Sequence, residues 1–266
     1  MPNGKEIYCV DKSTADYCYD EIYKEKIYLK RGIEINNGDV IFDIGANIGL
    51  FSLYINEIFE NLQIHAFEPV PVTFEALQKN LGNFSNIKLI NQGLGEKDEE
   101  VDIIFYPNNS GVSSPRRMDV DYRFEVIEKN WEEIMATYRP KLKNLPKFLR
   151  KFLMRIMAKP LLKTETIKCK LSNLSKYIRE NSIEHINLMK IDAENYEREV
   201  LRGLDEEDWN KIQQIAMEVH TRFEGEQFEL SEMISLLEDK GFDVSEGDES
   251  FDTMCGVYML YGKRKN

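Results

Sequence analysis

The stretch FDIGANIGLF (residues 42–51) places a glycine-rich turn directly behind an apolar run. In its D-x-G-x-x-x-G pattern, Gly45 and Gly49 let the chain turn sharply from strand into helix and let a ligand approach the backbone. A phosphate-binding P-loop would have Lys and then Ser or Thr after the last glycine, whereas two apolar residues follow here. The dinucleotide pattern G-x-G-x-x-G is also absent. The turn therefore predicts a site for another kind of small molecule at the end of a first strand.

Polar groups at successive strand ends narrow the choice of ligand. A carboxylate at Asp43 would repel a pyrophosphate, but it suits an ammonium group. Glu68, which ends the next strand in AFEP, can accept hydrogen bonds from a ribose diol, and NQGLG (91–95) offers backbone and amide groups to an adenine edge. An amino-acid ammonium group, a ribose and an adenine in that order describe S-adenosylmethionine. We therefore expect S-adenosylmethionine as the cofactor.

Short apolar runs alternate with helical patterns along the chain. The runs that predict strands are DVIFDIG (39–45), QIHAFEP (63–69), IKLINQG (87–93), INLMKIDAE (186–194), IQQIAMEVH (212–220) and VYMLYGKR (257–264). Residues 73–84, 171–181 and 228–242 carry apolar residues at helical spacing. The alternation predicts an α/β fold with a mostly parallel sheet and helices on both faces. Ligands of such sheets bind beyond the carboxyl ends of the strands.

Length and charge limit the class of protein. The 266-residue chain fits a single domain over residues 1–266, in which residues 1–38 form a helical cap. A net charge of −12 argues against a nucleic-acid or anionic-membrane binder, because both need a clustered basic surface. We expect a cytoplasmic protein, since the sequence shows neither a secretory signal nor an apolar run of membrane-spanning length. The four widely spaced cysteines favour reduced thiols over a zinc site.

Residues 116–165 interrupt the alternation with a mostly helical insertion. The stretch 141–163 within it contains eight Lys or Arg residues and no acid. Six apolar residues recur there at helical spacing, which indicates an amphipathic helix with a basic face: Phe148, Leu149, Phe152, Leu153, Ile156 and Met157. Such a helix can be a solvated lid, or it can dock an acidic carrier protein or an anionic substrate.

Four segments carry a resemblance to a known family: FDIGANIGLFSLYI (42–55), HAFEPVPVTFEAL (65–77), LMKIDAENYEREVLRGL (188–204) and MEVH (217–220). They resemble the FkbM family of S-adenosylmethionine-dependent methyltransferases, most closely its O-methylating members in polyketide and nonribosomal peptide assembly lines. The similarity extends from Asn3 to Tyr261. It implies the class I methyltransferase (Rossmann-like) fold, with strands ordered 3-2-1-4-5-7-6 and the last strand antiparallel.

The resemblance also implies cofactor contacts at Asp43, Gly45, Asn47 and Glu68. Together with the neighbouring turn and strand ends, the full set of expected cofactor residues is Asp43, Gly45, Ala46, Asn47, Gly49, Glu68, Pro69 and Gly93. The chain departs from the family at Asn195, where the family often has Gly.

The chemistry requires a group that removes a proton from the acceptor. Methyl transfer from a sulfonium is an in-line displacement, so the protein must position the acceptor and deprotonate it. Of three histidines, His65 lies inside a predicted strand and His185 precedes one, whereas His220 ends a strand at the ligand edge. The strand order places Asp192 or Glu194 beside His220. A neighbouring carboxylate raises the pKa of a histidine and fixes its tautomer. We expect a His220–Glu194 dyad as the general base.

Other roles stay open for these residues. His220 can simply satisfy hydrogen bonds at a strand end. Asp192 can contact the cofactor or the acceptor, or it can ligate a metal, for which Asn195 and Glu218 are the nearby candidates. We expect no metal. Glu197 begins a helix, where an acid suits the helix dipole, and it is interpreted as structural.

The expected activity is O-methylation of a hydroxyl group on a secondary metabolite. The metabolite can be free or tethered to a carrier protein, and neither nucleic acid nor a membrane is an expected partner. Carboxylate or glycan O-methylation and metal-assisted transfer are alternatives within the enzyme class. The alternative from another class is a cofactor-binding protein of the same fold without turnover.

Overall fold

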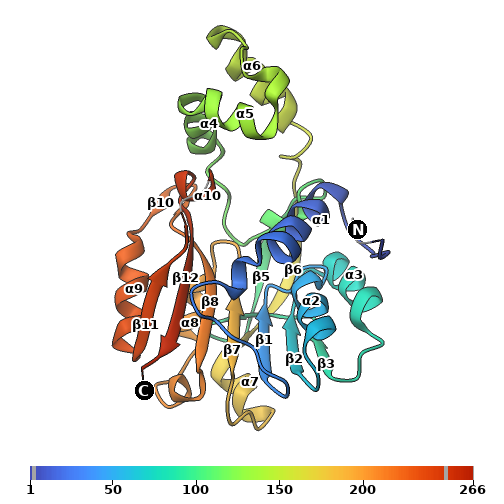
Figure 1. The fold of residues 1–266 in the computed structure, drawn as a ribbon, viewed down its shortest axis with the longest axis vertical. Coiled ribbons are helices and arrows are strands. Elements are labelled where there is room, and N and C mark those ends of the chain that lie inside the picture. Colours follow the sequence, from blue (N-terminus) through green and yellow to red (C-terminus); the bar gives the residue numbers. More distant parts are fainter. Residues whose placement is uncertain (2–3, 249–250, 266) are drawn as a thin grey trace.

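The computed structural model describes residues 1, 4–248 and 251–265, and its centre is a seven-stranded sheet. Across the sheet the strands follow in the order β3 (Ile87–Ile90), β2 (Gln63–Phe67), β1 (Val40–Ile44), β7 (Leu188–Ile191), β8 (Gln214–His220), β12 (Val257–Arg264) and β11 (Phe242–Glu246). β12 pairs antiparallel with both neighbours, and the other pairs are parallel. This order confirms the class I methyltransferase fold (Figure 1). Asn3, where the family resemblance begins, lies outside the described residues.

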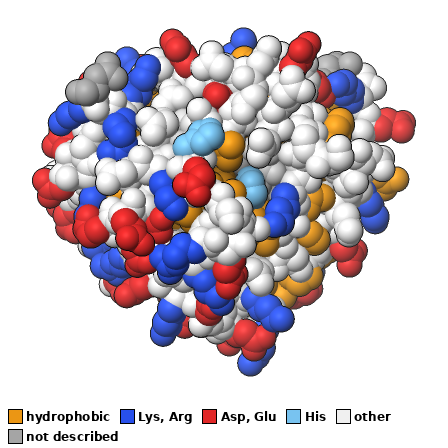
Figure 2. Space-filling model, turned by 90° about the horizontal axis from the view of Figure 1, so that it is seen from below, with side chains coloured by type: hydrophobic (Ala, Val, Ile, Leu, Met, Phe, Trp, Pro, Cys, Tyr) orange, Lys and Arg blue, Asp and Glu red, His pale blue; other side chains and the backbone are white. Residues whose placement is uncertain are grey.

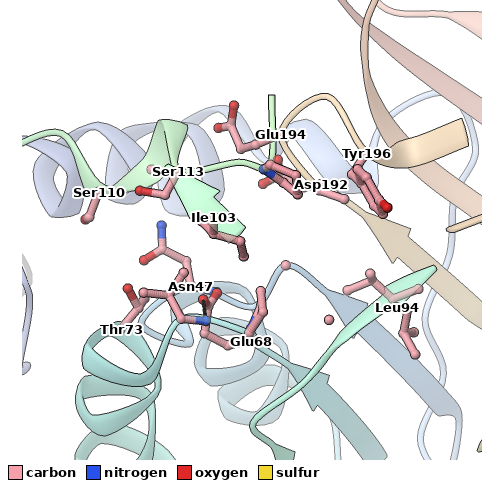
Figure 3. Close-up of a pocket in the computed structure, with 18 of the residues that line it drawn as sticks. Asn47, Glu68, Thr73, Leu94, Ile103, Ser110, Ser113, Asp192, Glu194 and Tyr196 are labelled. Atoms are coloured by element: carbon pink, nitrogen blue, oxygen red, sulfur yellow. Dashed lines mark hydrogen bonds between the residues drawn. The ribbon is translucent and has the colours of Figure 1, made fainter. Parts of the chain in front are cut away.

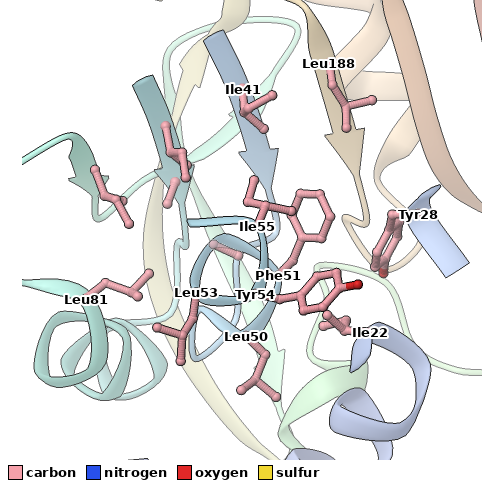
Figure 4. Packing of buried hydrophobic residues seen from close by; sticks show 14 of the residues in the cluster. Ile22, Tyr28, Ile41, Leu50, Phe51, Leu53, Tyr54, Ile55, Leu81 and Leu188 are labelled. Carbon is pink, nitrogen blue, oxygen red and sulfur yellow. The ribbon is translucent and has the colours of Figure 1, made fainter. Parts of the chain in front are cut away.

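Alternate side chains of the strands pack into two cores, one on each face of the sheet. In β1, Ile41 packs on one face and Phe42 and Ile44 on the other. The first face is covered by α2 (Leu50–Ile58), α3 (Pro71–Leu81) and the N-terminal cap, as Figure 4 shows for the cap and α2. The second face is covered by α7 (Leu174–Glu180), α8 (Glu197–Arg202) and α9 (Leu230–Asp239). Burial of each large apolar side chain contributes about 1.5–3 kcal/mol.

The N-terminal cap is helical only over part of the expected range of residues 1–38. It contains α1 (Lys12–Tyr19), a π-helical turn (Asp20–Glu25) and a 3-10 turn (Ile27–Leu29). The side chain of Asp11 accepts a hydrogen bond from the backbone N–H of Thr14 and so caps α1. Tyr28 is buried, with its ring 5.3 Å from that of Phe51, so the cap is anchored on α2.

A second, three-stranded sheet was not predicted from the sequence. It consists of β4 (Gly93–Gly95), β6 (Glu165–Asn173) and β5 (Glu99–Phe105), in that order. The predicted helix over 171–181 therefore begins only after Asn173. β11 was also missed, because α9 ends at Asp239 and Gly241 turns the chain at a φ of 86°. Neither β5 nor β6 has a long apolar run, because only alternate residues of each strand, such as Ile103, Phe105 and Cys169, pack into a small core with Val70.

The insertion lies between β5 and β6 and stands above the carboxyl ends of the central strands (Figure 1). It contains α4 (Val120–Lys129), α5 (Trp131–Tyr138), a 3-10 turn (Pro140–Leu142) and α6 (Lys147–Ala158). The remaining short elements are 3-10 turns at Ser110–Val112 and Asp208–Lys211, the hairpin β9 (Arg222–Phe223) and β10 (Glu226–Gln227), and α10 (Phe251–Met254). In the described part of the chain, no helix has the length and apolar character needed to cross a membrane.

Candidate active site

A cavity lies at the carboxyl ends of β1, β2 and β7 (Figure 3). Its empty volume is ≈ 680 Å³, part of which is open to solvent. Seven of the residues predicted from the sequence line it: Gly45, Asn47, Glu68, Pro69, Gly93, Asp192 and Glu194. The other walls come from α3, the second sheet, the loop before the insertion and the start of α8, and include Thr73, Leu94, Ile103, Ser110, Ser113 and Tyr196.

The turn after β1 can be formed only with glycine at position 45. Gly45 has a φ of 73°, and a Cβ there would lie 1.8 Å from the carbonyl oxygen of Asp192. The backbone N–H groups of Gly45 and Ala46 donate to the carbonyl oxygen of Phe67 at 3.1 and 2.9 Å. Gly49, at a φ of 89°, packs tightly against α3. Gly45 thus lines the cavity, whereas Ala46 and Gly49 shape the turn from behind.

Asp43 does not reach the cavity wall, contrary to the expected contact with a ligand ammonium group. Its carboxylate is fully buried, 3.2 Å from the Nζ of Lys190, and it accepts a hydrogen bond from Ser52 Oγ at 2.7 Å. Lys190 Nζ also donates to the Gly45 carbonyl oxygen at 2.6 Å and lies 3.4 Å from Asp192 Oδ2. Burial alone would lower the pKa of Lys190, but Asp43 and Asp192 outweigh it and raise that pKa. The protein's own ammonium group therefore occupies the side of Asp43 that we expected a ligand to use.

Glu68 and Asn47 form a polar lower wall of the cavity (Figure 3). Glu68 Oε2 accepts a hydrogen bond from the backbone N–H of Asn47 at 3.0 Å, and Oε1 accepts one from Val70 at 2.9 Å. Each oxygen keeps a free lone pair, so the carboxylate can accept two further hydrogen bonds, as a diol would supply. Burial raises the pKa of Glu68 to about 7. The side-chain oxygen of Asn47 is buried without a partner among the described residues, so it can accept from a donor on a bound molecule.

Gly93 lies on the cavity wall at a point where protein packing leaves no room for a side chain. A Cβ at this position would lie 2.6 Å from the Leu171 side chain and 3.4 Å from that of Pro69. Both Gly93 and Pro69 line the cavity. Gly93 of the NQGLG stretch therefore lies on the cavity wall, and its expected contact with an adenine stays a prediction.

His220 lies behind the cavity rim instead of on it. Its side chain is buried, with Nε2 3.2 Å from Glu194 Oε2 and Nδ1 3.0 Å from Glu197 Oε1. Glu218 Oε1 lies 3.5 Å from the same Nε2. Burial alone would lower the pKa of His220, but Glu197 and Glu194 outweigh it and hold that pKa well above its ordinary value. The predicted pair of His220 and Glu194 is thus formed, with Glu194 as its cavity-lining member.

Glu194 and Asp192 are held on the upper side of the cavity by different partners. Asp192 Oδ2 accepts a hydrogen bond from the hydroxyl group of Tyr28 at 2.9 Å, so the cap contributes directly to the site. The carboxylate of Glu194 points away from Glu68, toward the side of the insertion (Figure 3). Burial raises the pKa of Glu194 above its ordinary value. The cavity therefore has a polar wall below, formed by Glu68 and Asn47, and the carboxylates of Asp192 and Glu194 above.

The backbone that carries Glu194 is held in an uncommon conformation. Glu194 and Asn195 have φ values of 47° and 69°, in the left-handed region where asparagine and glycine are the favoured residues. Ser114 Oγ donates to the Glu194 carbonyl oxygen, and Arg116 donates to that of Asn195 at 2.8 Å. Arg116 also forms an ion pair of 2.6 Å with Glu199. The residues that begin the insertion thus clamp the loop, and the family departure at Asn195 keeps a residue type that tolerates this φ.

Three residues of the site were missed or misread in the sequence. Glu197 was interpreted as structural, yet it accepts from His220 and from the Asn195 backbone; its spacing of three residues from Glu194 was the available signal. Lys190 lies two residues before Asp192 in the predicted KIDAE strand, but no ion-pair partner was predicted for it. Arg116 could not be assigned, because it meets Glu199 from 83 positions away in the sequence.

The predicted alternatives for the other residues can now be located. His65 is packed inside β2, with Nδ1 2.8 Å from the Tyr177 hydroxyl group, and burial lowers its pKa to about 4. His185 is exposed and lies before β7, away from the cavity. Among the described residues, no group of three or more His, Cys, Asp or Glu side chains is arranged to hold a metal ion.

Known proteins are similar to this chain over most of its length. A family profile described as "Methyltransferase FkbM domain" matches residues 43–244. 31-O-demethyl-FK506 methyltransferase FkbM of Streptomyces tacrolimicus is 32% identical over 268 residues, which cover 99% of this chain and 95% of that protein. AMB antimetabolite synthetase AmbE of Pseudomonas aeruginosa is 31% identical over 271 residues, covering 99% of this chain but 12% of that protein. Methyltransferase 1 of Beauveria bassiana is 28% identical over 257 residues, which cover 95% of this chain and 91% of that protein.

Substitutions at Asn195 test the backbone conformation. Asn195→Gly should leave the free energy of unfolding within about 1 kcal/mol of the wild type, because glycine adopts a positive φ without strain. Asn195→Val should lower it by about 1–3 kcal/mol, because a β-branched residue cannot adopt that φ cheaply. Denaturant unfolding measures both, with Asn210→Val at an exposed position of ordinary φ as the control. Equal stability of the Gly and Val variants would contradict the assigned conformation.

Lys190→Met tests the buried ion pair. It should lower the free energy of unfolding by about 3–5 kcal/mol, because the fully buried Asp43 loses its compensating charge. Adding Asp43→Asn to Lys190→Met should restore part of that loss, since the unpaired charge is then removed. If the double variant is no more stable than Lys190→Met alone, the two side chains are not coupled as the structure indicates.

Proposed function

The chain belongs to the FkbM family of S-adenosylmethionine-dependent methyltransferases, and on that premise we propose that it methylates a hydroxyl oxygen of a secondary metabolite. The observation that carries the proposal is a single cavity with Glu68 and Asn47 on its lower wall and Glu194 on the opposite side. The proposal treats residues 1–266 as one domain, with residues 1–38 as its cap and 116–165 as its insertion.

The names of two relatives support this class of acceptor. One is named for 31-O-demethyl-FK506, an acceptor that lacks a methyl group on an oxygen. Another is named as an antimetabolite synthetase. The first name supports an oxygen acceptor, and the second supports a role in making a secondary metabolite. We propose an acceptor that is either free or tethered to a carrier protein.

The residues of the lower wall suit the cofactor. When bound, S-adenosylmethionine supplies a methyl group on a positively charged sulfur, which is a good leaving group. Glu68 would accept hydrogen bonds from the two ribose hydroxyl groups, and the unpartnered Asn47 oxygen would accept one from the ammonium group. At Gly45 and Gly93, which have no side chain, the backbone itself would contact the cofactor. Asp43 would act indirectly, because it holds Lys190 and through it the turn at Gly45.

Glu194 is the proposed acceptor of the substrate proton. It lines the cavity, and its raised pKa makes it a stronger base than an exposed glutamate. The raised pKa of His220 keeps the imidazole protonated at neutral pH, so it serves as a cation that orients and stabilises the Glu194 carboxylate. This revises the sequence-based expectation of His220 as the base. In the revised dyad His220 is a positioning residue, held in turn by Glu197.

The transfer is proposed to need no metal. The carboxylates that a metal could use already have protein partners: Asp192 accepts from Tyr28 and pairs with Lys190, and Glu194 and Glu218 face His220. A metal would have to displace these partners. Treatment with a chelator should therefore leave turnover unchanged, whereas a loss that magnesium restores would overturn this part of the proposal.

Glu68 controls the affinity for the cofactor. Glu68→Gln should weaken binding of S-adenosylmethionine about 10- to 100-fold in calorimetry, because one of the two acceptor oxygens becomes a donor group. Glu75→Gln, at an exposed position of α3, is the matched control and should bind like the wild type. Unchanged binding by Glu68→Gln would remove Glu68 from the cofactor site.

The raised pKa of Glu68 predicts how cofactor binding depends on pH. Above its pKa of about 7 the carboxylate is ionised and accepts two hydrogen bonds, and below it a proton occupies one oxygen. Affinity should therefore fall as the pH is lowered from 8 to 6, by up to about tenfold per unit below 7. Burial is the main cause of the raised pKa of Glu68; the backbone hydrogen bonds from Val70 and Asn47 and the charge of Lys190 oppose it, and the charge of Asp192 adds to it. Glu68→Gln should lose this dependence, and a pH-independent wild type would contradict it.

Glu194→Gln and His220→Gln test the dyad. Each should lower turnover about 10²- to 10⁴-fold. Glu194→Gln removes the base that takes the proton from the acceptor hydroxyl group, and His220→Gln removes the cation that orients that base. Cofactor affinity in calorimetry should change by less than about threefold, since neither residue lies on the lower wall. In the wild type, the rate should fall as acid protonates Glu194. Mass spectrometry of labelled methyl transfer measures turnover; a fully active Glu194→Gln with an inactive His220→Gln would restore His220 as the base.

A further inference from the structure

Helix α6 of the insertion lies at the end of the molecule that is farthest from the central sheet, at the top of Figure 1, and it exposes apolar side chains. Three apolar side chains follow one another at spacings of four residues and are strongly exposed: Phe148 at 81%, Phe152 at 67% and Ile156 at 52%. Each is directly preceded by a basic residue: Lys147, Lys151 and Arg155. We call these six residues the α6 surface. Residues at this spacing share one side of a helix, so an apolar row runs beside a basic row.

The orientation of α6 is fixed from its other side. Met154 is buried, and the Arg150 guanidinium lies 5.2 Å from the centre of the Trp131 ring and donates to the Leu145 carbonyl oxygen at 2.9 Å. Lys151 forms an ion pair with Glu128 of α4 at 3.1 Å. One face of α6 therefore packs on the rest of the insertion, and the apolar row of the α6 surface is exposed to solvent.

Positive charge predominates in the stretch that carries the α6 surface, although Lys151 pairs with Glu128 of α4 and Arg150 lies 3.9 Å from Glu132 of α5. The stretch 141–163 holds eight Lys or Arg residues and no acid, in a chain whose net charge is −12. At the opposite end of the molecule, acidic and basic side chains are intermixed (Figure 2). The clustered basic surface that an anionic-membrane binder needs is thus supplied locally, although the overall charge argued against it. Two α6 surfaces would repel each other, which disfavours pairing with a second copy of this chain through this helix.

We propose that the α6 surface docks the protein on an anionic lipid bilayer. A helix that lies in the bilayer interface inserts Phe, Ile or Leu side chains below the headgroups while flanking Lys and Arg side chains contact lipid phosphates. The α6 surface has both features on one exposed, convex side of a helix. An acidic protein would match the basic row as well, but it would need a groove shaped for three separate large side chains. A bilayer accepts them without shape complementarity.

Sedimentation with lipid vesicles tests the proposal. The whole protein should bind vesicles of phosphatidylcholine containing about one third phosphatidylglycerol, and binding should weaken strongly between about 0.1 and 0.5 M salt. Binding to pure phosphatidylcholine vesicles should be at least about tenfold weaker. Absence of binding to the anionic vesicles, or equal binding to both kinds, would overturn the proposal. The first result would leave an acidic protein as the occupant of the surface.

Variants separate the two rows of the α6 surface. Reversal of the basic row with Lys147→Glu, Lys151→Glu and Arg155→Glu together should weaken vesicle binding by about 100-fold or more. Replacement of the apolar row with Phe148→Ser, Phe152→Ser and Ile156→Ser should weaken it at least about tenfold. The matched control reverses three exposed basic residues elsewhere, Lys97 in the turn between β4 and β5 and Lys168 and Lys170 in β6, and should bind like the wild type. If this control loses binding equally, the attraction is a general charge effect and the α6 surface is not the docking site.

A single-residue probe reports insertion without relying on loss of binding. Phe152→Trp keeps an aromatic side chain at an exposed position, so folding should be unaffected. Its fluorescence should shift to shorter wavelength with the anionic vesicles and be quenched by brominated lipid. An unshifted spectrum on vesicles that do bind the protein would show that another surface makes the contact. Cofactor binding needs no vesicle, so this experiment can fail while the proposed methyltransferase activity stands.

Discussion

The buried ammonium group of Lys190 is the interaction on which the rest of the site depends. It contacts Asp43 of β1, Asp192 at the end of β7 and the carbonyl oxygen of Gly45. β1 and β7 are neighbours in the parallel sheet, so one charged group fixes both the turn on the cofactor side and the loop that leads to Glu194. Burial of a charge is tolerated only where opposite charges and hydrogen bonds compensate it. The sheet is therefore most tightly constrained where two reactants would have to meet.

Strain in the backbone gives the acceptor side its geometry. Two consecutive non-glycine residues, Glu194 and Asn195, are held at positive φ, which persists only where the surroundings impose it. The surroundings here are Ser114 and Arg116, at the start of the insertion, together with Glu197 of α8. Arg116, the first residue of the insertion, thus connects the insertion to the loop that carries Glu194. A family that often has glycine at this position gains the same φ without the constraint that asparagine carries.

The distribution of charge separates two tasks in one acidic protein. Carboxylates gather around the cavity, where Lys190 and His220 compensate them and where burial raises the pKa values of Glu68 and Glu194. Positive charge gathers on α6, at the far end of the insertion, beside exposed apolar side chains. Net charge alone describes neither region. An attraction that depends on a local cluster can therefore coexist with an overall charge of the opposite sign.

The sequence by itself determined six of the seven strands of the central sheet, the sheet class and the positions of Gly45 and Glu68, because periodicity and turn geometry are properties of neighbouring residues. Local patterns also identified His220 and Glu194 as strand-end partners. Only the tertiary structure decided which side chains face the cavity, since this depends on segments distant in the sequence. Asp43 was placed behind the wall by packing that brings Lys190 against it, 147 positions later. The second sheet and the clamp on Glu194 were hidden for the same physical reason: their partners meet only when the chain has folded.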